Sequence, residues 1–221
     1  TDAGEPALIT TRDVVLVDEK AWPKALRFSP PHSGKAVVYF APPTTRKRSG
    51  RRTAQIQRMH SVNLANGRAS GALDMPSIYE LIDVSPSGNR ALVGIKAKRG
   101  RGHSRVDVVS FEPKKHVAAW RPYEAETEAK KSRWSSIKTS VWSKLVSEDL
   151  VLTINGKGKL IAWKLPSCEA AYVIEEFGKP LAISPQGRYF VGSKNNKLYI
   201  FESATGDCKG ELEAPSVTAK G

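Results

Sequence analysis

The sequence predicts an all-β protein built from repeated four-stranded antiparallel units. Three observations support this prediction. Short runs of alternating apolar residues recur along the chain and are bounded by turn residues. A Ser-Pro turn occupies the same place in three of the units, and four strand-like runs follow one another within each of the better-matched units.

The recurring turn comes after the first strand of a unit. It reads Ser29-Pro30, Ser85-Pro86-Ser87-Gly88 and Ser184-Pro185-Gln186-Gly187. Proline presets the first turn position and glycine accepts a positive φ, so the pattern favours a tight chain reversal. We therefore expect second strands directly after the turns, at residues 36–40, 91–95 and 189–192.

Third and fourth strands follow in the same order. Apolar runs at residues 106–111, 160–165 and 198–201 predict the third strands, and runs at 116–120, 170–174 and 209–212 predict the fourth. The best-matched pair aligns Leu160–Trp163 with Leu198–Phe201 and Cys168 with Cys208. These offsets agree with a repeat period of roughly 40–45 residues once short gaps are allowed.

The repeats divide the chain into units with expected boundaries at 25–78, 79–122, 138–178 and 179–213. In the third unit the first turn is degenerate and reads Ser147-Glu148-Asp149. Residues 1–24 contain a strand-like run that fits the remnant of a preceding unit, and residues 214–221 form a tail. The segment 123–137 interrupts the repeat, and its acidic residues followed by basic ones favour a short inserted helix.

The turn, the apolar third strand that ends in an aromatic residue, and the closing Thr205-Gly206-Asp207 resemble WD-repeat β-propellers over about residues 25–213. The Trp-Asp pair of that family is replaced by Trp163-Lys164, Phe201-Glu202 and Phe111-Glu112. The resemblance implies a β-propeller of four-stranded antiparallel blades, of which about four are present. Such a partial ring would be completed by further blades of a longer chain or by a second copy.

Positive charge is the unusual feature of the composition. The 221 residues carry a formal net charge of +13, which favours an anionic partner. Two segments, 42–53 and 96–105, hold ten basic residues and no acidic one, and both lie between a second and a third strand. The resemblance implies that they project side by side from one face. The candidate anion-binding residues are Arg46, Lys47, Arg48, Arg51, Arg52, Lys98, Arg99, Arg101 and Arg105.

These features predict a non-catalytic scaffold whose basic loops bind an acidic or phosphorylated protein partner. The alternative is a nucleic-acid-associated module held by phosphate contacts, although neither segment contains an aromatic residue on which bases could stack. Loops that only keep the protein soluble, and a nuclear-import signal at residues 46–52, also remain open. A propeller enzyme of lactonase-like type is a third alternative.

No motif predicts catalysis, a metal or a cofactor. The four histidines lack metal-ligand spacing, and Asn155-Gly156 reads as a hairpin turn. Neither a nucleophile elbow nor a phosphate-binding glycine-rich loop is present. The two cysteines are expected to be reduced. No apolar stretch has the length of a membrane span, and charged residues lie within the first 20 positions, where a signal peptide would be apolar. The compartment stays unknown, with an intracellular location favoured and a nuclear one open.

Overall fold

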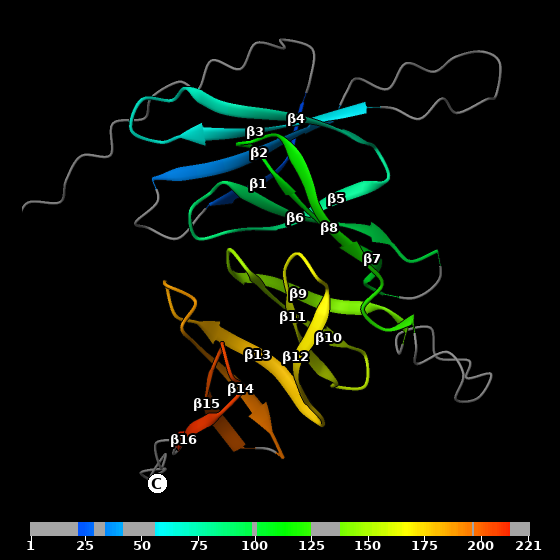
Figure 1. The fold of residues 1–221 in the computed structure, drawn as a ribbon, viewed down its shortest axis with the longest axis vertical. Coiled ribbons are helices and arrows are strands. Elements are labelled where there is room, and N and C mark those ends of the chain that lie inside the picture. Colours follow the sequence, from blue (N-terminus) through cyan, green and yellow to red (C-terminus); the bar gives the residue numbers. More distant parts are fainter. Residues whose placement is uncertain are drawn as a thin grey trace, which may run out of the picture.

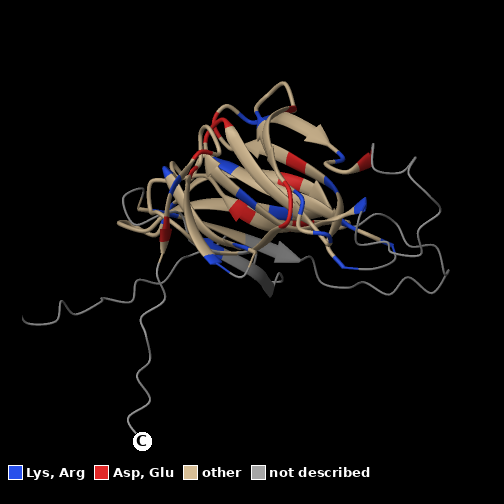
Figure 2. Cartoon of the chain, turned by 90° about the horizontal axis from the view of Figure 1, so that it is seen from below, with Lys and Arg blue, Asp and Glu red and all other residues tan. Residues whose placement is uncertain are grey.

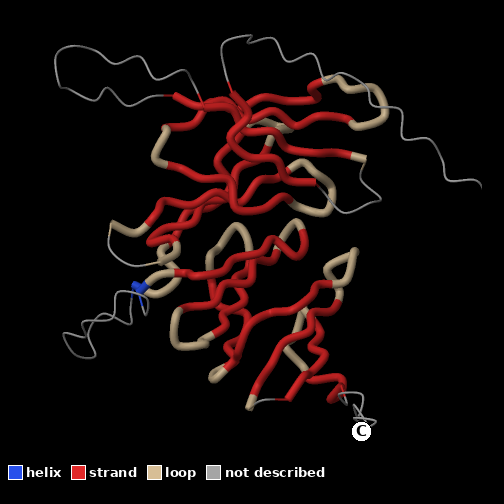
Figure 3. The backbone as a smooth tube through the Cα atoms, turned by 180° about the vertical axis from the view of Figure 1, so that it is seen from behind, coloured by secondary structure: helices blue, strands red, loops and turns tan. Residues whose placement is uncertain are grey.

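Antiparallel strands make up nearly all of the described chain, as Figure 3 shows. The computed structural model describes residues 22–28, 34–41, 56–98, 101–124, 138–195 and 197–212. Sixteen strands occur in this part of the chain, and each pairs with its neighbours in chain order within groups of four. No helix among the described residues has the length and apolar character needed to cross a bilayer.

The strands form four successive groups of four, which we call the first to the fourth sheet and which follow one another along the longest axis of the molecule (Figure 1). A single backbone pairing joins the second and the third into one eight-stranded sheet. The first sheet contains β1 (Trp22–Phe28), β2 (Lys35–Ala41), β3 (Ile56–Asn63) and β4 (Ala69–Pro76). The second contains β5 (Tyr79–Val84), β6 (Arg90–Lys96), β7 (His103–Ser110) and β8 (Lys115–Trp120). The third contains β9 (Ser140–Ser147), β10 (Leu150–Asn155), β11 (Leu160–Lys164) and β12 (Glu169–Ile174). The fourth contains β13 (Phe177–Ile183), β14 (Tyr189–Lys194), β15 (Lys197–Glu202) and β16 (Cys208–Leu212).

Apolar clusters fill the spaces between successive sheets. Because side chains alternate along a strand, neighbouring residues serve opposite faces. Val93 of β6 packs in the cluster shared with the first sheet, whereas Leu92 packs in the cluster shared with the third. Val151 and Leu152 of β10 likewise contact the second and the fourth sheet, respectively. Successive sheets thus pack face to face in the manner of β-propeller blades, and the all-β prediction is confirmed.

The Ser-Pro-x-Gly turns have the predicted geometry. The Gly88 N–H donates to the Ser85 carbonyl at 2.9 Å, and the Gly187 N–H donates to the Ser184 carbonyl at 2.8 Å. Both glycines have a φ near +70°. In each turn the serine hydroxyl also accepts a backbone N–H, from Arg90 or from Tyr189, at 3.0 Å. The two turns therefore have the same structure. The serine hydroxyl accepts a hydrogen bond that closes each turn, and glycine adopts the positive φ that the turn requires.

The degenerate turn of the third sheet is held by charge instead. Arg90 of β6 lies 3.6 Å from the Glu148 carboxylate and 3.3 Å from that of Asp149, and it also donates to the Glu148 carbonyl. The Ser87 N–H donates to Glu148 Oε1 at 3.1 Å. Glu148 and Asp149, which follow Ser147 in place of Pro and the next turn residue, thus attach this turn to the Ser-Pro turn of the second sheet.

Asp83 connects the first strands of the second and third sheets. Its Oδ1 accepts from Lys144 Nζ at 2.7 Å, and its Oδ2 accepts from the Leu145 N–H at 2.8 Å. Asp83 is only 5% exposed, and burial raises the pKa of its carboxyl group although Lys144 and the Leu145 N–H oppose the shift. A single backbone pairing between His103 and Ser140 also connects these sheets.

Several predicted elements agree with the structure, and others lie outside the described residues. The expected second strands fall within β2, β6 and β14. Cys168 and Cys208 are free, the first half-buried and the second exposed. The expected leading strand, the tail and most of the inserted segment lie outside the described residues. Tyr123, at the start of that segment, is buried and bonds Thr153 Oγ1 and the Lys159 carbonyl at 2.9 Å each.

Replacing Asp83 with Ala should lower the free energy of unfolding by about 2–4 kcal/mol, because the buried Leu145 N–H and Lys144 lose their acceptor. Asp83→Asn retains an acceptor oxygen and should lose less. Urea denaturation of both variants measures the difference. The matched control is Asp74→Ala, which removes a half-exposed pair with Arg58 and should cost less than about 1 kcal/mol. Equal losses for Asp83→Ala and the control would contradict a structural role for the Asp83 contact.

Candidate functional site

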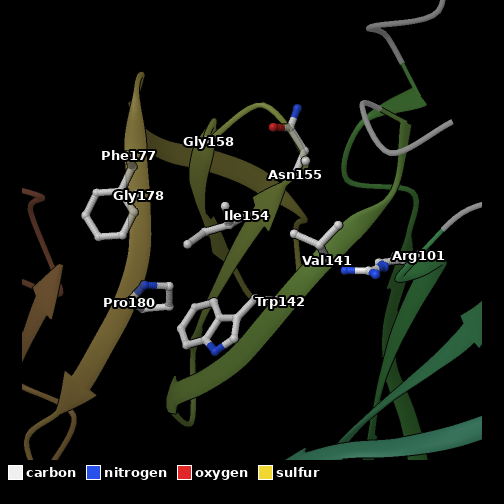
Figure 4. Close-up of a pocket in the computed structure, with 10 residues that line it drawn as sticks. Arg101, Val141, Trp142, Ile154, Asn155, Gly158, Phe177, Gly178 and Pro180 are labelled. Atoms are coloured by element: carbon white, nitrogen blue, oxygen red, sulfur yellow. The ribbon is translucent and has the colours of Figure 1, made fainter. Parts of the chain in front are cut away.

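A cavity of about 660 Å³ lies between the third and fourth sheets (Figure 4). Its walls come from the first strand of each of these two sheets, from the end of β10, and from two connections between second and third strands. The described residues that line it are Arg101, Val141, Trp142, Ile154, Asn155, Gly156, Gly158, Phe177, Gly178 and Pro180.

The body of the cavity is apolar. Trp142 of β9 is paired in register with Ile154 of β10, so both belong to one wall. Figure 4 shows the Trp142 indole pointing toward Pro180 on β13. Val141 is 42% exposed at the side nearest Arg101, whereas Ile154 and Phe177 are almost fully buried. The cavity therefore offers exposed apolar surface above a packed apolar floor.

The turn from Asn155 to Lys159 forms one end of the cavity. The Asn155 Oδ1 accepts the Lys157 N–H at 2.9 Å and the Lys159 N–H at 3.0 Å, which fixes the turn. The Phe177 N–H donates to the Gly158 carbonyl at 2.7 Å and thereby attaches the turn to β13. Gly158 has a φ of +80°, and a Cβ there would lie 2.4 Å from the Phe177 carbonyl oxygen. Only glycine fits this approach.

Arg101 stands at the rim, on the connection between β6 and β7. Its carbonyl accepts from the Thr139 hydroxyl at 2.7 Å, which holds the connection against the start of β9. Within the connection the Ala97 N–H donates to the Gly102 carbonyl at 3.0 Å. The backbone at Arg101 is therefore fixed, whereas the residue is exposed.

The connections between second and third strands share one end of the sheets and carry basic residues. We call this the basic end and define it by the described residues 97–98, 101–102, 156–159, 194–195 and 197. Lys159 pairs with Glu175 at 3.2 Å and Lys197 with Glu211 at 2.9 Å. Among the described residues no carboxylate forms an ion pair with the four other cations, which are Lys98, Arg101, Lys157 and Lys194.

The predicted anion-binding residues do not all lie in one place in the structure. Lys98 and Arg101 lie at the basic end. Arg105 is not in the loop as expected but in β7, in register with Ile95, because β6 and β7 extend further than the sequence suggested. Its guanidinium binds both oxygens of the buried Asp107, at 2.7 and 2.9 Å. The other candidates, Arg46, Lys47, Arg48, Arg51, Arg52 and Arg99, lie outside the described residues.

Asp107 is the centre of a second polar cluster. Besides Arg105, it accepts from the Tyr79 hydroxyl at 3.0 Å and contacts His116 Nε2 at 3.0 Å. Burial, followed by the hydrogen bond to Asp107, raises the pKa of the Tyr79 phenol. Arg105 is thus engaged within the fold, and its role in partner binding stays a prediction.

Comparison with known proteins gives only a distant likeness. No protein-family model matches the sequence, and no curated protein does. Among solved structures, BamB from Moraxella catarrhalis is similar over 83% of this chain and 47% of its own, with 12% identity and a TM-score of 0.43. The dihydro-heme d1 dehydrogenase NirN in complex with DHE is similar over 86% of this chain and 36% of its own, with 16% identity and a TM-score of 0.45. The chain spans less than half the length of either structure.

The cavity is chemically suited to binding. Its described lining contains one cation and one amide, and the rest is apolar or glycine. No group of three or more possible metal ligands occurs among the described residues. The sequence pattern does not identify Trp142, Phe177 and Pro180 as site residues, because nothing in it shows that the Asn-Gly turn approaches β13. The Asn155-Gly156 pair predicts a turn and nothing more.

Gly158→Ala should destabilise the protein by about 1–3 kcal/mol, because the left-handed backbone and the close Phe177 carbonyl both oppose a Cβ. Thermal unfolding measures the loss. Gly210→Ala serves as the control, since a Cβ at that position has open space around it. A Gly158→Ala protein as stable as the control would show that the turn is not held against β13.

Proposed function

We propose that the chain is a non-catalytic interaction scaffold whose basic end binds an acidic protein partner. The observation that supports this proposal most directly is the grouping of cations on adjacent sheets. Arg101 of the second sheet and Gly158 of the third line one cavity. The third-sheet cation is the exposed Lys157, which directly precedes Gly158 in its turn. Lys194 of the fourth sheet is in register with Phe177, which contacts the same turn. Three sheets therefore contribute to one basic surface.

The grouping is local and does not merely reflect the net charge of the chain. Figure 2 shows basic and acidic residues interspersed over the described strands and turns. Turns at the opposite end contain Glu112, Glu148, Asp149 and Asp207 together with basic residues. Mixed charges attract a polyanion weakly, whereas cations without acidic partners attract it strongly. An acidic partner would therefore approach the basic end.

The segment 42–53 belongs to the same proposal. It connects β2 and β3, which makes it the first-sheet counterpart of residues 97–102. Its arginines suit carboxylates and phosphates because a guanidinium donates two parallel hydrogen bonds. The proposed partner is acidic or phosphorylated, and the WD-repeat type of the propeller is part of the same proposal.

An uncovered apolar face supports the idea that the sheets continue into further blades or a second copy. Ala182, Val191, Ile200 and Lys209 line a hollow of about 580 Å³ on the fourth sheet. Phe190 and Phe201 mark the opposite, covered face of the fourth sheet, which packs against Leu152 of the third sheet. A further sheet placed on the hollow would repeat the face-to-face packing seen between the other sheets.

Removing three cations of the basic end should weaken binding of an acidic ligand at least about tenfold while leaving the melting temperature unchanged, because exposed unpaired charges contribute little to folding. The variant is Lys98→Ser/Arg101→Ser/Lys157→Ser, and the probe is fluorescein-labelled hexaglutamate measured by anisotropy. The matched control, Arg68→Ser/Lys114→Ser/Lys115→Ser, removes three exposed cations near the opposite end. Equal losses in the two variants would contradict a localised site.

The salt dependence of binding distinguishes the nucleic-acid alternative from the proposed acidic protein partner. Under the proposed function, a duplex DNA of arbitrary sequence should bind weakly. Under the nucleic-acid alternative, phosphate contacts dominate, and the affinity for DNA should fall steeply as the salt concentration is raised. Replacing Arg46, Lys47, Arg48, Arg51 and Arg52 with Ser in the same assay should also reduce hexaglutamate binding. Tight, steeply salt-dependent DNA binding without hexaglutamate binding would favour the alternative.

A further inference from the structure

The cavity between β9 and β13 combines an apolar body with a cation at its rim. Figure 4 shows Arg101 beside Val141, while Trp142, Ile154 and Pro180 extend the apolar surface away from it. None of the described lining residues is acidic. Glu175, which precedes this part of β13, is held by Lys159. The cavity therefore favours a ligand with a bulky apolar group next to a negative charge.

The volume of the cavity indicates a ligand larger than a single side chain. At about 660 Å³ it falls within the range of roughly 300–1,000 Å³ that is typical of ligand sites. A short run of peptide fills such a space, and one residue leaves most of it empty. Trp142 and Pro180 present flat apolar surfaces, which suit an aromatic side chain.

The charge at the rim favours a carboxylate over a phosphate. Arg101 is the one cation among the described lining residues, and Lys157 belongs to the same turn as Gly158 without lining the cavity. A single guanidinium matches a carboxylate in charge and in bidentate geometry. A dianionic phosphate is bound best by clusters of cations.

We propose that this cavity binds an acidic peptide by taking a bulky apolar side chain between Trp142 and Pro180 while Arg101 binds the adjacent carboxylate. The inference rests on the proposed function and deepens it, because it gives the basic end a specific anchor. Charge alone attracts any acidic segment, whereas the cavity selects segments that carry an apolar residue beside the acid.

The experiment uses a fluorescein-labelled peptide of sequence Gly-Ser-Gly-Leu-Trp-Glu-Gly-Ser-Gly and three relatives. One replaces Leu-Trp with Ser-Ser, one replaces Glu with Gln, and one replaces Glu with phosphoserine. Binding to the full chain is measured by anisotropy. Loss of the apolar pair should weaken binding about tenfold or more, and loss of the carboxylate should weaken it by a similar factor.

Two variants of the protein test the same contacts by changing the cavity in place of the peptide. Arg101→Gln should weaken binding of the Leu-Trp-Glu peptide about tenfold and have no effect on the Gln peptide. Val141→Ser removes exposed apolar surface at the rim and should weaken both peptides about threefold. Arg68→Gln is the matched control, because Arg68 is also an exposed arginine but lies near the opposite end of the sheets and does not line the cavity. Circular dichroism and melting confirm that each variant folds.

The outcomes separate the cavity from the basic end. Equal binding of the Leu-Trp and Ser-Ser peptides overturns the cavity inference, and hexaglutamate binding would still support the proposed function. If binding requires both the Leu-Trp pair and Arg101 but the protein does not bind hexaglutamate, the result supports the cavity inference. The same result overturns the proposal that the basic end binds acidic partners by charge alone. Tighter binding of the phosphoserine peptide overturns the assignment of a carboxylate. Equal effects of Arg101→Gln and Arg68→Gln overturn the role of Arg101.

Discussion

Each inner sheet has apolar side chains on both faces, and this is the constraint on which the rest of the structure depends. Leu92 and Val93 illustrate it within one strand, since they enter different clusters. A sheet of this kind is stable only when a neighbour covers each face, because exposed apolar surface costs roughly 25 cal/mol per Å². The turns and the Asp83 contact set the alignment of sheets that burial has already brought together.

The candidate site follows from that packing. Face-to-face sheets leave their first strands and their connections close to one another, so residues distant in sequence meet there. Arg101, Trp142, Gly158 and Pro180 come from four separate segments, yet they line one cavity. The site is therefore a property of the interface between sheets, and a change that displaces the fourth sheet would remove one wall while leaving Arg101 in place.

The sequence predicts the strands that alternate clearly and misses those that do not. In β3 the buried positions include Gln57 and Ser61 beside Met59, so the apolar alternation of this strand is interrupted and its sequence signal is weak. The Ser-Pro-x-Gly turns were predictable because local chemistry determines them. The cavity was not, because it depends on the Gly158–Phe177 contact between sheets. Arg105 shows a different limit, since its contact with Asp107, two residues further along the same strand, follows only once β7 is known to begin at His103.

The two thiols differ in a way that has a practical consequence. Burial raises the pKa of the Cys168 thiol, whereas Cys208 is exposed at the start of β16. Since the thiolate is the reactive form, maleimide reagents at neutral pH will modify Cys208 first. A dye or spin label can thus be attached to the outer strand of the last sheet in the natural sequence. Such a label reports on movements of that sheet without altering any residue that lines the cavity.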